Sequence, residues 1–96
     1  MQYFHRTSMM PDAVLGVADD FLSSHFTLES RTDRDRTFRG PIGTLKLHVR
    51  PEGGHYTLIT IETDQVTESE ADKVAKRLLG VIHKTVEPAH KLRGAY

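Results

Sequence analysis

Residues 45–63 read LKLHVRPEGGHYTLITIET, and this stretch decides the fold. Leu45, Leu47 and Val49 alternate with polar residues, which is the pattern of a half-buried strand. Residues 56–63 are predicted as the partner strand, because the Pro-Glu-Gly-Gly sequence between them is typical of a hairpin turn. If residues 51–54 form that turn, the predicted register places three pairs opposite each other: Val49 and His55, Leu47 and Thr57, and Leu45 and Ile59.

This hairpin also predicts which face of the sheet is buried, because cross-strand partners share a face. One face is apolar and carries Leu45, Leu47, Val49, Thr57, Ile59 and Ile61. The other face is mixed and carries Lys46, His48, Arg50, Tyr56, Leu58 and Thr60. We expect the first face to be the core.

The residues that follow predict a long C-terminal helix. Thr67 and Glu70 have the spacing of a capping box. Asp72 is expected on the solvent side, where it would pair with Lys76 one turn later. Pro88 predicts that the helix ends or kinks at about residue 87. The apolar stripe of this helix is predicted to consist of Ala71, Val74, Ala75, Leu78, Ile82 and Val86.

The N-terminal half predicts a strand, a helix and a second hairpin. Pro11 and Asp12 suit the first turn of a helix, and apolar residues follow at helical spacing up to Leu22. The turn of the second hairpin is expected at Asp33-Arg34-Asp35, because aspartate satisfies local backbone donors. The predicted bounds are a strand over residues 2–8, a helix over 11–25, and strands over 26–32 and 36–40.

Together these elements predict one α+β domain over residues 1–96, in the order β-α-β-β-β-β-α. We expect an antiparallel sheet with two helices packed on one face. This layout resembles the TBP-like and helix-grip folds, including the minimal half of the polyketide-cyclase/START-like ligand-binding domains. It also resembles small polyhydroxyalkanoate-granule-associated bacterial proteins. The helix-grip resemblance implies an apolar ligand between helix and sheet, and the TBP-like resemblance implies an open sheet face that can bind DNA.

Composition and charge exclude several classes of protein. The chain has no cysteine, so disulfides and thiolate metal sites are excluded. It has no apolar run of roughly 18 residues, which a membrane-spanning helix needs. Its N-terminus lacks the pattern of a secretory signal, and we expect a cytoplasmic protein without a membrane partner.

The charge pattern argues against nucleic acid as a partner. Thirteen basic residues balance thirteen acidic ones, whereas a dedicated nucleic-acid binder usually has a basic excess. The hairpin over residues 31–39 concentrates four arginines and could contact phosphates. Asp33 and Asp35 interleave with these arginines, which favours a solvated turn that neutralises itself. The arginines are Arg31, Arg34, Arg36 and Arg39.

No motif indicates catalysis, and we expect neither an enzyme nor a cofactor or metal. The serines lack a G-x-S-x-G elbow, and the glycines do not form a phosphate-binding loop before a helix. The histidines have neither H-x3-H nor H-E-x-x-H spacing. They are His5, His25, His48, His55, His83 and His90.

The mixed sheet face is the leading candidate for function. His48, Tyr56, Leu58 and Thr60 would leave apolar area in water if both helices cover the other face. Single exposed apolar residues are also ordinary on protein surfaces. We expect a non-enzymatic binding or scaffold domain that forms a homodimer through this face. The alternative is a helix-grip-type binder of a small apolar ligand between the C-terminal helix and the sheet.

Overall fold

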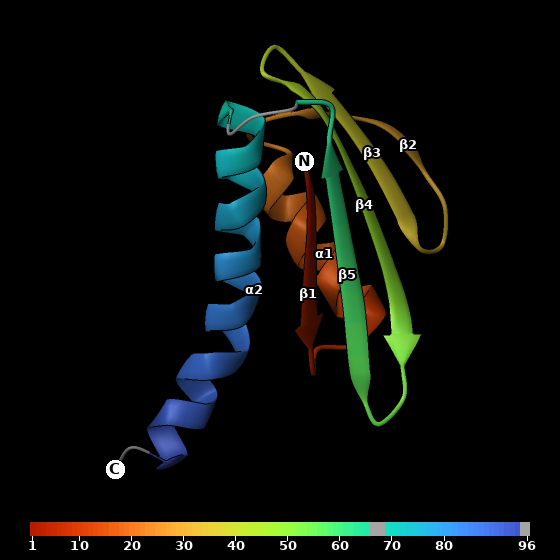
Figure 1. The fold of residues 1–96 in the computed structure, drawn as a ribbon. Helices are drawn as coiled ribbons and strands as arrows, with labels where there is room; N and C mark the ends of the chain where they lie inside the picture. The colour runs from red at the N-terminus through yellow and green to blue at the C-terminus, as the bar shows by residue number, and fades with distance from the viewer. Residues whose placement is uncertain (66–68, 95–96) are drawn as a thin grey trace.

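A computed structural model of the chain describes residues 1–65 and 69–94, with side chains up to residue 85. The strands form one five-stranded antiparallel sheet in the spatial order β1-β5-β4-β3-β2. Both helices lie on the same side of this sheet (Figure 1). The prediction of an α+β domain with an antiparallel sheet and two helices is confirmed. The elements are β1 (Gln2–Thr7), α1 (Pro11–Leu22), β2 (Thr27–Arg31), β3 (Asp35–Gly40), β4 (Gly43–Glu52), β5 (Tyr56–Thr63) and α2 (Glu70–Gly94).

The first and last strands are neighbours in space. β1 pairs with β5, while β2 to β5 follow one another as consecutive hairpins. α1 therefore carries the chain from one edge of the sheet to the other (Figure 1). This connection places β1 beside β5, which is far away in the sequence, and the pairing decides which β1 side chains lie on each face of the sheet.

The β4–β5 hairpin is longer than predicted, and its register is a correction. Its turn covers residues 53–55, where Gly54 and His55 have φ angles of +83° and +99°. The predicted partners of Val49, Leu47 and Leu45 are each displaced by four residues. Because side chains alternate with a period of two, an even displacement leaves both faces with their predicted residues. The observed pairs are Val49 and Ile59, Leu47 and Ile61, and Leu45 and Thr63.

Pro51 was predicted in the turn but lies within β4, opposite Thr57. The backbone N–H of Val49 donates to the carbonyl of Arg34, on the β3 side of the strand. Groups two residues apart point the same way, so the nitrogen of Pro51 also faces away from β5. The pairing of β3 with β4 stops at His48, so this nitrogen faces no strand and the missing donor breaks no ladder.

Three elements of the N-terminal half, β1, α1 and β2, end one to three residues earlier than predicted, whereas β3 begins one residue earlier. α1 stops at Leu22, and the hydroxyls of Ser23 and Ser24 donate to the carbonyls of Asp20 and Phe21. These hydrogen bonds satisfy carbonyls that the end of a helix leaves without a partner. The β2–β3 turn covers residues 32–34, and the Thr32 hydroxyl organises it by accepting from the backbone nitrogens of residues 34 and 35.

The core lies between the helices and the predicted apolar face of the sheet, which is confirmed as buried. Phe38 extends this face onto β3 and packs near Phe26, with ring centroids 6.4 Å apart. The sheet contributes Phe38, Leu45, Leu47, Val49, Ile59 and Ile61, and the helices contribute Val14, Leu15, Ala18, Leu22, Ala71, Val74, Ala75, Leu78 and Ile82.

The cap of α2 differs from the predicted one. Thr67, half of the predicted capping box, lies outside the described residues, and the helix begins at Glu70. Ser69 and Asp72 form a reciprocal cap instead, in which each backbone N–H donates to the other side chain, at 3.2 and 3.3 Å. At its other end, α2 continues past Pro88 rather than ending before it. A proline removes one backbone hydrogen bond, which the neighbouring turns of a long helix can outweigh.

The cap turns Asp72 inward, so the prediction of a solvent-facing Asp72 is wrong. Its side chain is fully buried, and the hydroxyls of Tyr3 and Thr63 donate to Oδ1 at 2.9 and 2.8 Å. The Ser69 hydroxyl donates to Oδ2 at 2.8 Å. Burial opposes the charged form, but the hydrogen bonds from Ser69, Thr63 and Tyr3 outweigh it and hold the pKa of Asp72 below its ordinary value.

α2 also packs against β1 through a pair of histidines. The rings of His5 and His83 meet edge to face, with centroids 6.3 Å apart. Burial, and after it the nearby His83, holds the pKa of His5 below its ordinary value. The folded state therefore favours the neutral form of His5.

This pair predicts an acid-sensitive contribution to stability. Because the pKa of His5 is lower in the folded state, neutral His5 contributes fully to the free energy of unfolding above about pH 6.5. This contribution declines as the pH falls below that value. The variant His5→Gln should lose less unfolding free energy than the wild type between pH 7.5 and 5.5, approximately the range in which histidine titrates. Urea unfolding at several pH values measures this loss. His25→Gln, at a histidine near Phe21 instead, is the control and should behave as the wild type; equal losses in all three proteins would contradict the prediction.

Candidate functional site

The face of the sheet opposite the helices is open to solvent (Figure 1). Strand pairing arranges its side chains in rows that run across the strands. One row contains Phe4, Thr60, His48 and Asp35, the next contains Arg6, Leu58 and Arg50, and the third contains Tyr56 and Glu52. We call the surface formed by these three rows the open face.

All four residues that the sequence singled out lie on the open face. His48 lies directly opposite Thr60. Leu58 and Thr60 are half-buried, whereas Tyr56 is 50% exposed near the end of the hairpin. The structure brings the four together because the error in the predicted register was an even number of residues.

Phe4 is the apolar open-face residue that sequence reasoning missed. It is 62% exposed and lies opposite Thr60, diagonally across from Leu58. Phe4, Leu58 and Tyr56 therefore form an oblique apolar line across β1 and β5. The sequence of β1 mixes aromatic and polar residues at both parities, so its pattern alone did not assign Phe4 to either face. The pairing of β1 with β5 makes that assignment.

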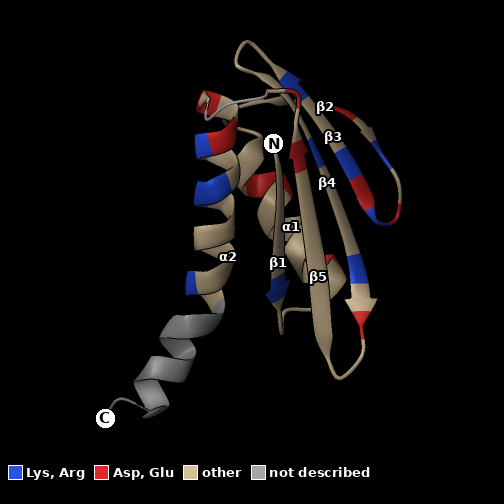
Figure 2. Cartoon of the chain, viewed as in Figure 1, with Lys and Arg blue, Asp and Glu red and all other residues tan. Residues whose placement is uncertain are grey.

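An ion pair crosses the apolar line, because Arg6 of β1 reaches over β5 to Glu52 of β4. Arg6 Nε lies 2.6 Å and Arg50 Nη2 lies 3.8 Å from the carboxylate of Glu52. In the neighbouring row, His48 Nδ1 lies 2.7 Å from Asp35, and this hydrogen bond holds the pKa of Asp35 below its ordinary value. Basic and acidic residues are interspersed along the strands (Figure 2). The open face thus carries apolar side chains along one line, which the Arg6–Glu52 pair crosses between Leu58 and Tyr56.

The arginines of the β2–β3 hairpin do not form one basic patch. Arg36 binds Asp19 of α1, whereas Arg39 binds Glu29 of β2. The sequence had assigned their neutralisation to Asp33 and Asp35. The carboxylate of Asp35 is hydrogen-bonded to His48 and Thr32, and it also interacts electrostatically with Arg36, as that interpretation expects.

The open face presents two chemical features, an acid–base pair and exposed aromatic side chains. The His48–Asp35 pair is its closest approach to an acid–base arrangement, but both side chains are about half exposed, and solvent weakens such a pair. Within residues 1–65 and 69–85, no three His, Asp or Glu side chains are placed to hold a metal ion. Exposed aromatic side chains are enriched at protein interfaces.

The space between α2 and the sheet gives no support to the alternative of an apolar ligand. Leu78 and Ile82 of α2 and the facing Ile59 and Ile61 of β5 are fully buried. These side chains fill the interface that a helix-grip ligand would occupy.

The chain matches no protein-family model, and no curated protein is significantly similar to it in sequence. The resemblance to TBP-like and helix-grip folds therefore stays a prediction from element order. Among the described helices, none is both long enough and apolar enough to cross a bilayer.

Proposed function

We propose that this protein is a non-enzymatic scaffold module that joins two copies of itself through the open face. The observation that carries the proposal is the apolar line formed by Phe4, Leu58 and Tyr56, on the side of the sheet that neither described helix covers. Exposed apolar groups on a regular sheet face gain free energy when a partner removes them from water.

The charges around this line favour a second copy over a polyanion. Arg6 and Arg50 share Glu52, and Lys46 lies directly opposite Glu62 on the adjoining row. A nucleic acid would meet carboxylates as often as cations on this surface, which weakens phosphate binding. A symmetric partner presents the same mixture, so a twofold arrangement can place cations against carboxylates.

A charge on the apolar line should dissociate the dimer. Tyr56→Glu places a carboxylate in the proposed interface, and we expect it to weaken association by about 100-fold. Light scattering at about 1 mM protein should give a mass near twice the chain mass of 10.9 kDa for the wild type and 10.9 kDa for the variant.

Met10→Glu is the matched control. Met10 is 72% exposed but precedes α1, outside the rows of the open face, so this variant should remain a dimer. Dissociation of both variants would contradict association through the open face, as would a Tyr56→Glu protein that keeps the wild-type mass.

A further inference from the structure

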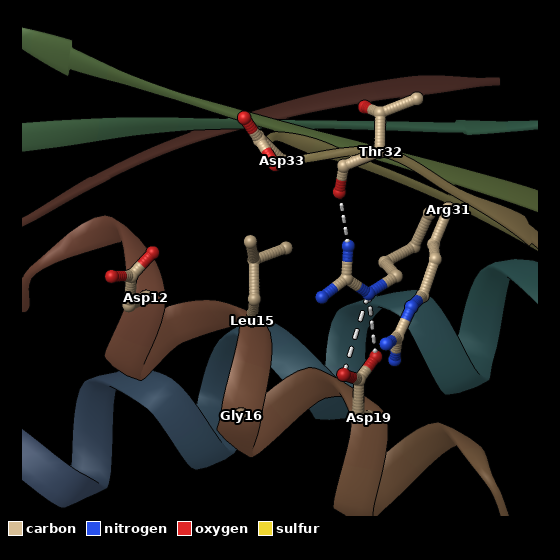
Figure 3. Close-up of a pocket in the computed structure, with 8 residues that line it drawn as sticks. Asp12, Leu15, Gly16, Asp19, Arg31, Thr32 and Asp33 are labelled. Atoms are coloured by element: carbon tan, nitrogen blue, oxygen red, sulfur yellow. Dashed lines mark hydrogen bonds and ion pairs between the residues drawn. The ribbon is translucent and has the colours of Figure 1, made fainter.

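A cleft of about 510 Å³ lies on the helix side of the sheet, between α1 and the β2–β3 turn (Figure 3). Its volume is within the range of sites that bind small molecules. It is separate from the open face, because α1 packs on the other side of the sheet (Figure 1). A ligand here would therefore belong to a function independent of self-association.

One end of the cleft carries two arginines with an incomplete set of partners. Arg31 and Arg36 lie directly opposite each other on β2 and β3, and like charges at such positions repel. Arg36 is held in place: its Nε donates to Asp19 at 3.0 Å, and its Nη1 donates to the carbonyls of Thr32 and Asp35 at 2.7 and 2.9 Å. Asp19 thus pairs with Arg36 and not with Arg31.

Donors remain for an anion at this end. Within the part of the chain that the structure describes, neither Arg36 Nη2 nor the guanidinium of Arg31 donates to a protein acceptor. In the same residues, no buried side-chain nitrogen or oxygen lacks a partner, so Nη2 is accessible to solvent. Both arginines line the cleft, and an oxyanion there would neutralise the charge that Asp19 leaves uncompensated.

The other end of the cleft is acidic. Asp12 of α1 lies at the end opposite Arg31, and Asp33 of the turn lies above the side chain of Leu15, between the two ends (Figure 3). Neither carboxylate forms an ion pair with a described residue of the chain. The lining thus runs from Asp12, past Asp33 and the nearly buried Leu15, to the guanidinium donors.

Gly16 leaves the helix wall of the cleft bare. A Cβ atom at this position would have no heavy atom within 4 Å, so packing within the protein does not require glycine. Glycine inside a helix costs about 1 kcal/mol relative to alanine. Glycine at this position allows a ligand to approach the helix backbone closely.

We propose that the cleft binds a small amphoteric molecule, of the class of amino acids that carry a cationic chain. Its carboxylate lies at Arg31 and Arg36, its terminal ammonium lies at Asp12 and Asp33, and its alkyl chain passes Leu15. The charge order of the lining selects molecules that carry both groups.

A titration followed by NMR of the backbone amides tests this proposal, with L-lysine as the probe. L-Lysine should shift the amide signals of Gly16, Thr32 and Asp33 in a saturable manner. Cadaverine, which lacks the carboxylate, and hexanoate, which lacks the ammonium, should bind at least about tenfold more weakly. No saturable shift at about 20 mM L-lysine, or equal binding of lysine and cadaverine, overturns the proposal.

Two variants separate binding from folding. Arg31→Gln should weaken L-lysine binding by about tenfold or more. Gly16→Ala should raise the melting temperature, because alanine favours the helix, and yet weaken binding. Asp20→Asn, at an exposed position of α1 outside the cleft, is the control and should bind as the wild type. Unchanged affinity in both Arg31→Gln and Gly16→Ala overturns the assignment of the site to this cleft.

Discussion

Replacement of Asp72 by alanine should lower the free energy of unfolding by about 3 kcal/mol. The carboxylate accepts from Tyr3 of β1, Thr63 of β5 and Ser69 at the start of α2, so it joins three elements within the core. Alanine leaves these donors without their acceptor, and buried donors without a partner cost more than a lost exposed contact. Urea unfolding at pH 7, followed by circular dichroism, measures the change.

Glu70→Ala is the control for this substitution. Glu70 lies in the same first turn, but its side chain is 61% exposed, so its loss should cost less than about 0.5 kcal/mol. A cost for Asp72→Ala as small as that of Glu70→Ala would contradict the structural role of the network.

The network also makes the free energy of unfolding sensitive to acid. The pKa of Asp72 is lower in the folded state than in the unfolded state. The ionised carboxylate therefore contributes fully to the free energy of unfolding above the unfolded pKa of about 4, and this contribution is lost as the pH falls through the folded pKa. Asp72→Asn, which removes the titrating group, should therefore lose less stability than the wild type below about pH 4. An identical acid dependence in the two proteins would contradict this assignment.

Replacement of Phe38 by alanine should cost about 4 kcal/mol. Its ring is 1% exposed and, together with Phe26, anchors the β2–β3 hairpin to the core. Leu28 lies directly opposite Phe38 on β2 but is 39% exposed, so Leu28→Ala is a control on the same rung of the ladder. It should cost about 1 kcal/mol or less. Similar losses in the two variants, again by urea unfolding, would mean that the hairpin is not anchored through Phe38.

The two faces of the sheet could be predicted from sequence because they depend on a local period of two. The register could not, because the Pro51–His55 segment contains two sets of turn residues. Pro51 and Gly53 suit a turn that starts early, whereas Gly54 and His55 form the observed turn and allow both strands to extend. Pairing of the longer strands, a non-local effect, decides between them. The open-face residues were still assigned to the correct face, because the register was displaced by an even number of residues.

The remaining errors concern contacts between residues that are far apart in the chain. Asp72 has the spacing of a solvent-facing helix position, and only Tyr3 and Thr63 reveal why it is buried. Phe4 joins the open face through the pairing of β1 with β5, which no local pattern encodes. The cleft beside Arg31 likewise depends on how α1 packs against the β2–β3 turn.

Sedimentation equilibrium of the wild-type protein is the most direct test of self-association through the open face. Between about 10 µM and 1 mM, the average mass should rise from the chain mass of 10.9 kDa towards twice that value. Over the same range, Tyr56→Glu should remain at 10.9 kDa. A wild-type mass of 10.9 kDa at the highest concentration would contradict the proposed scaffold function.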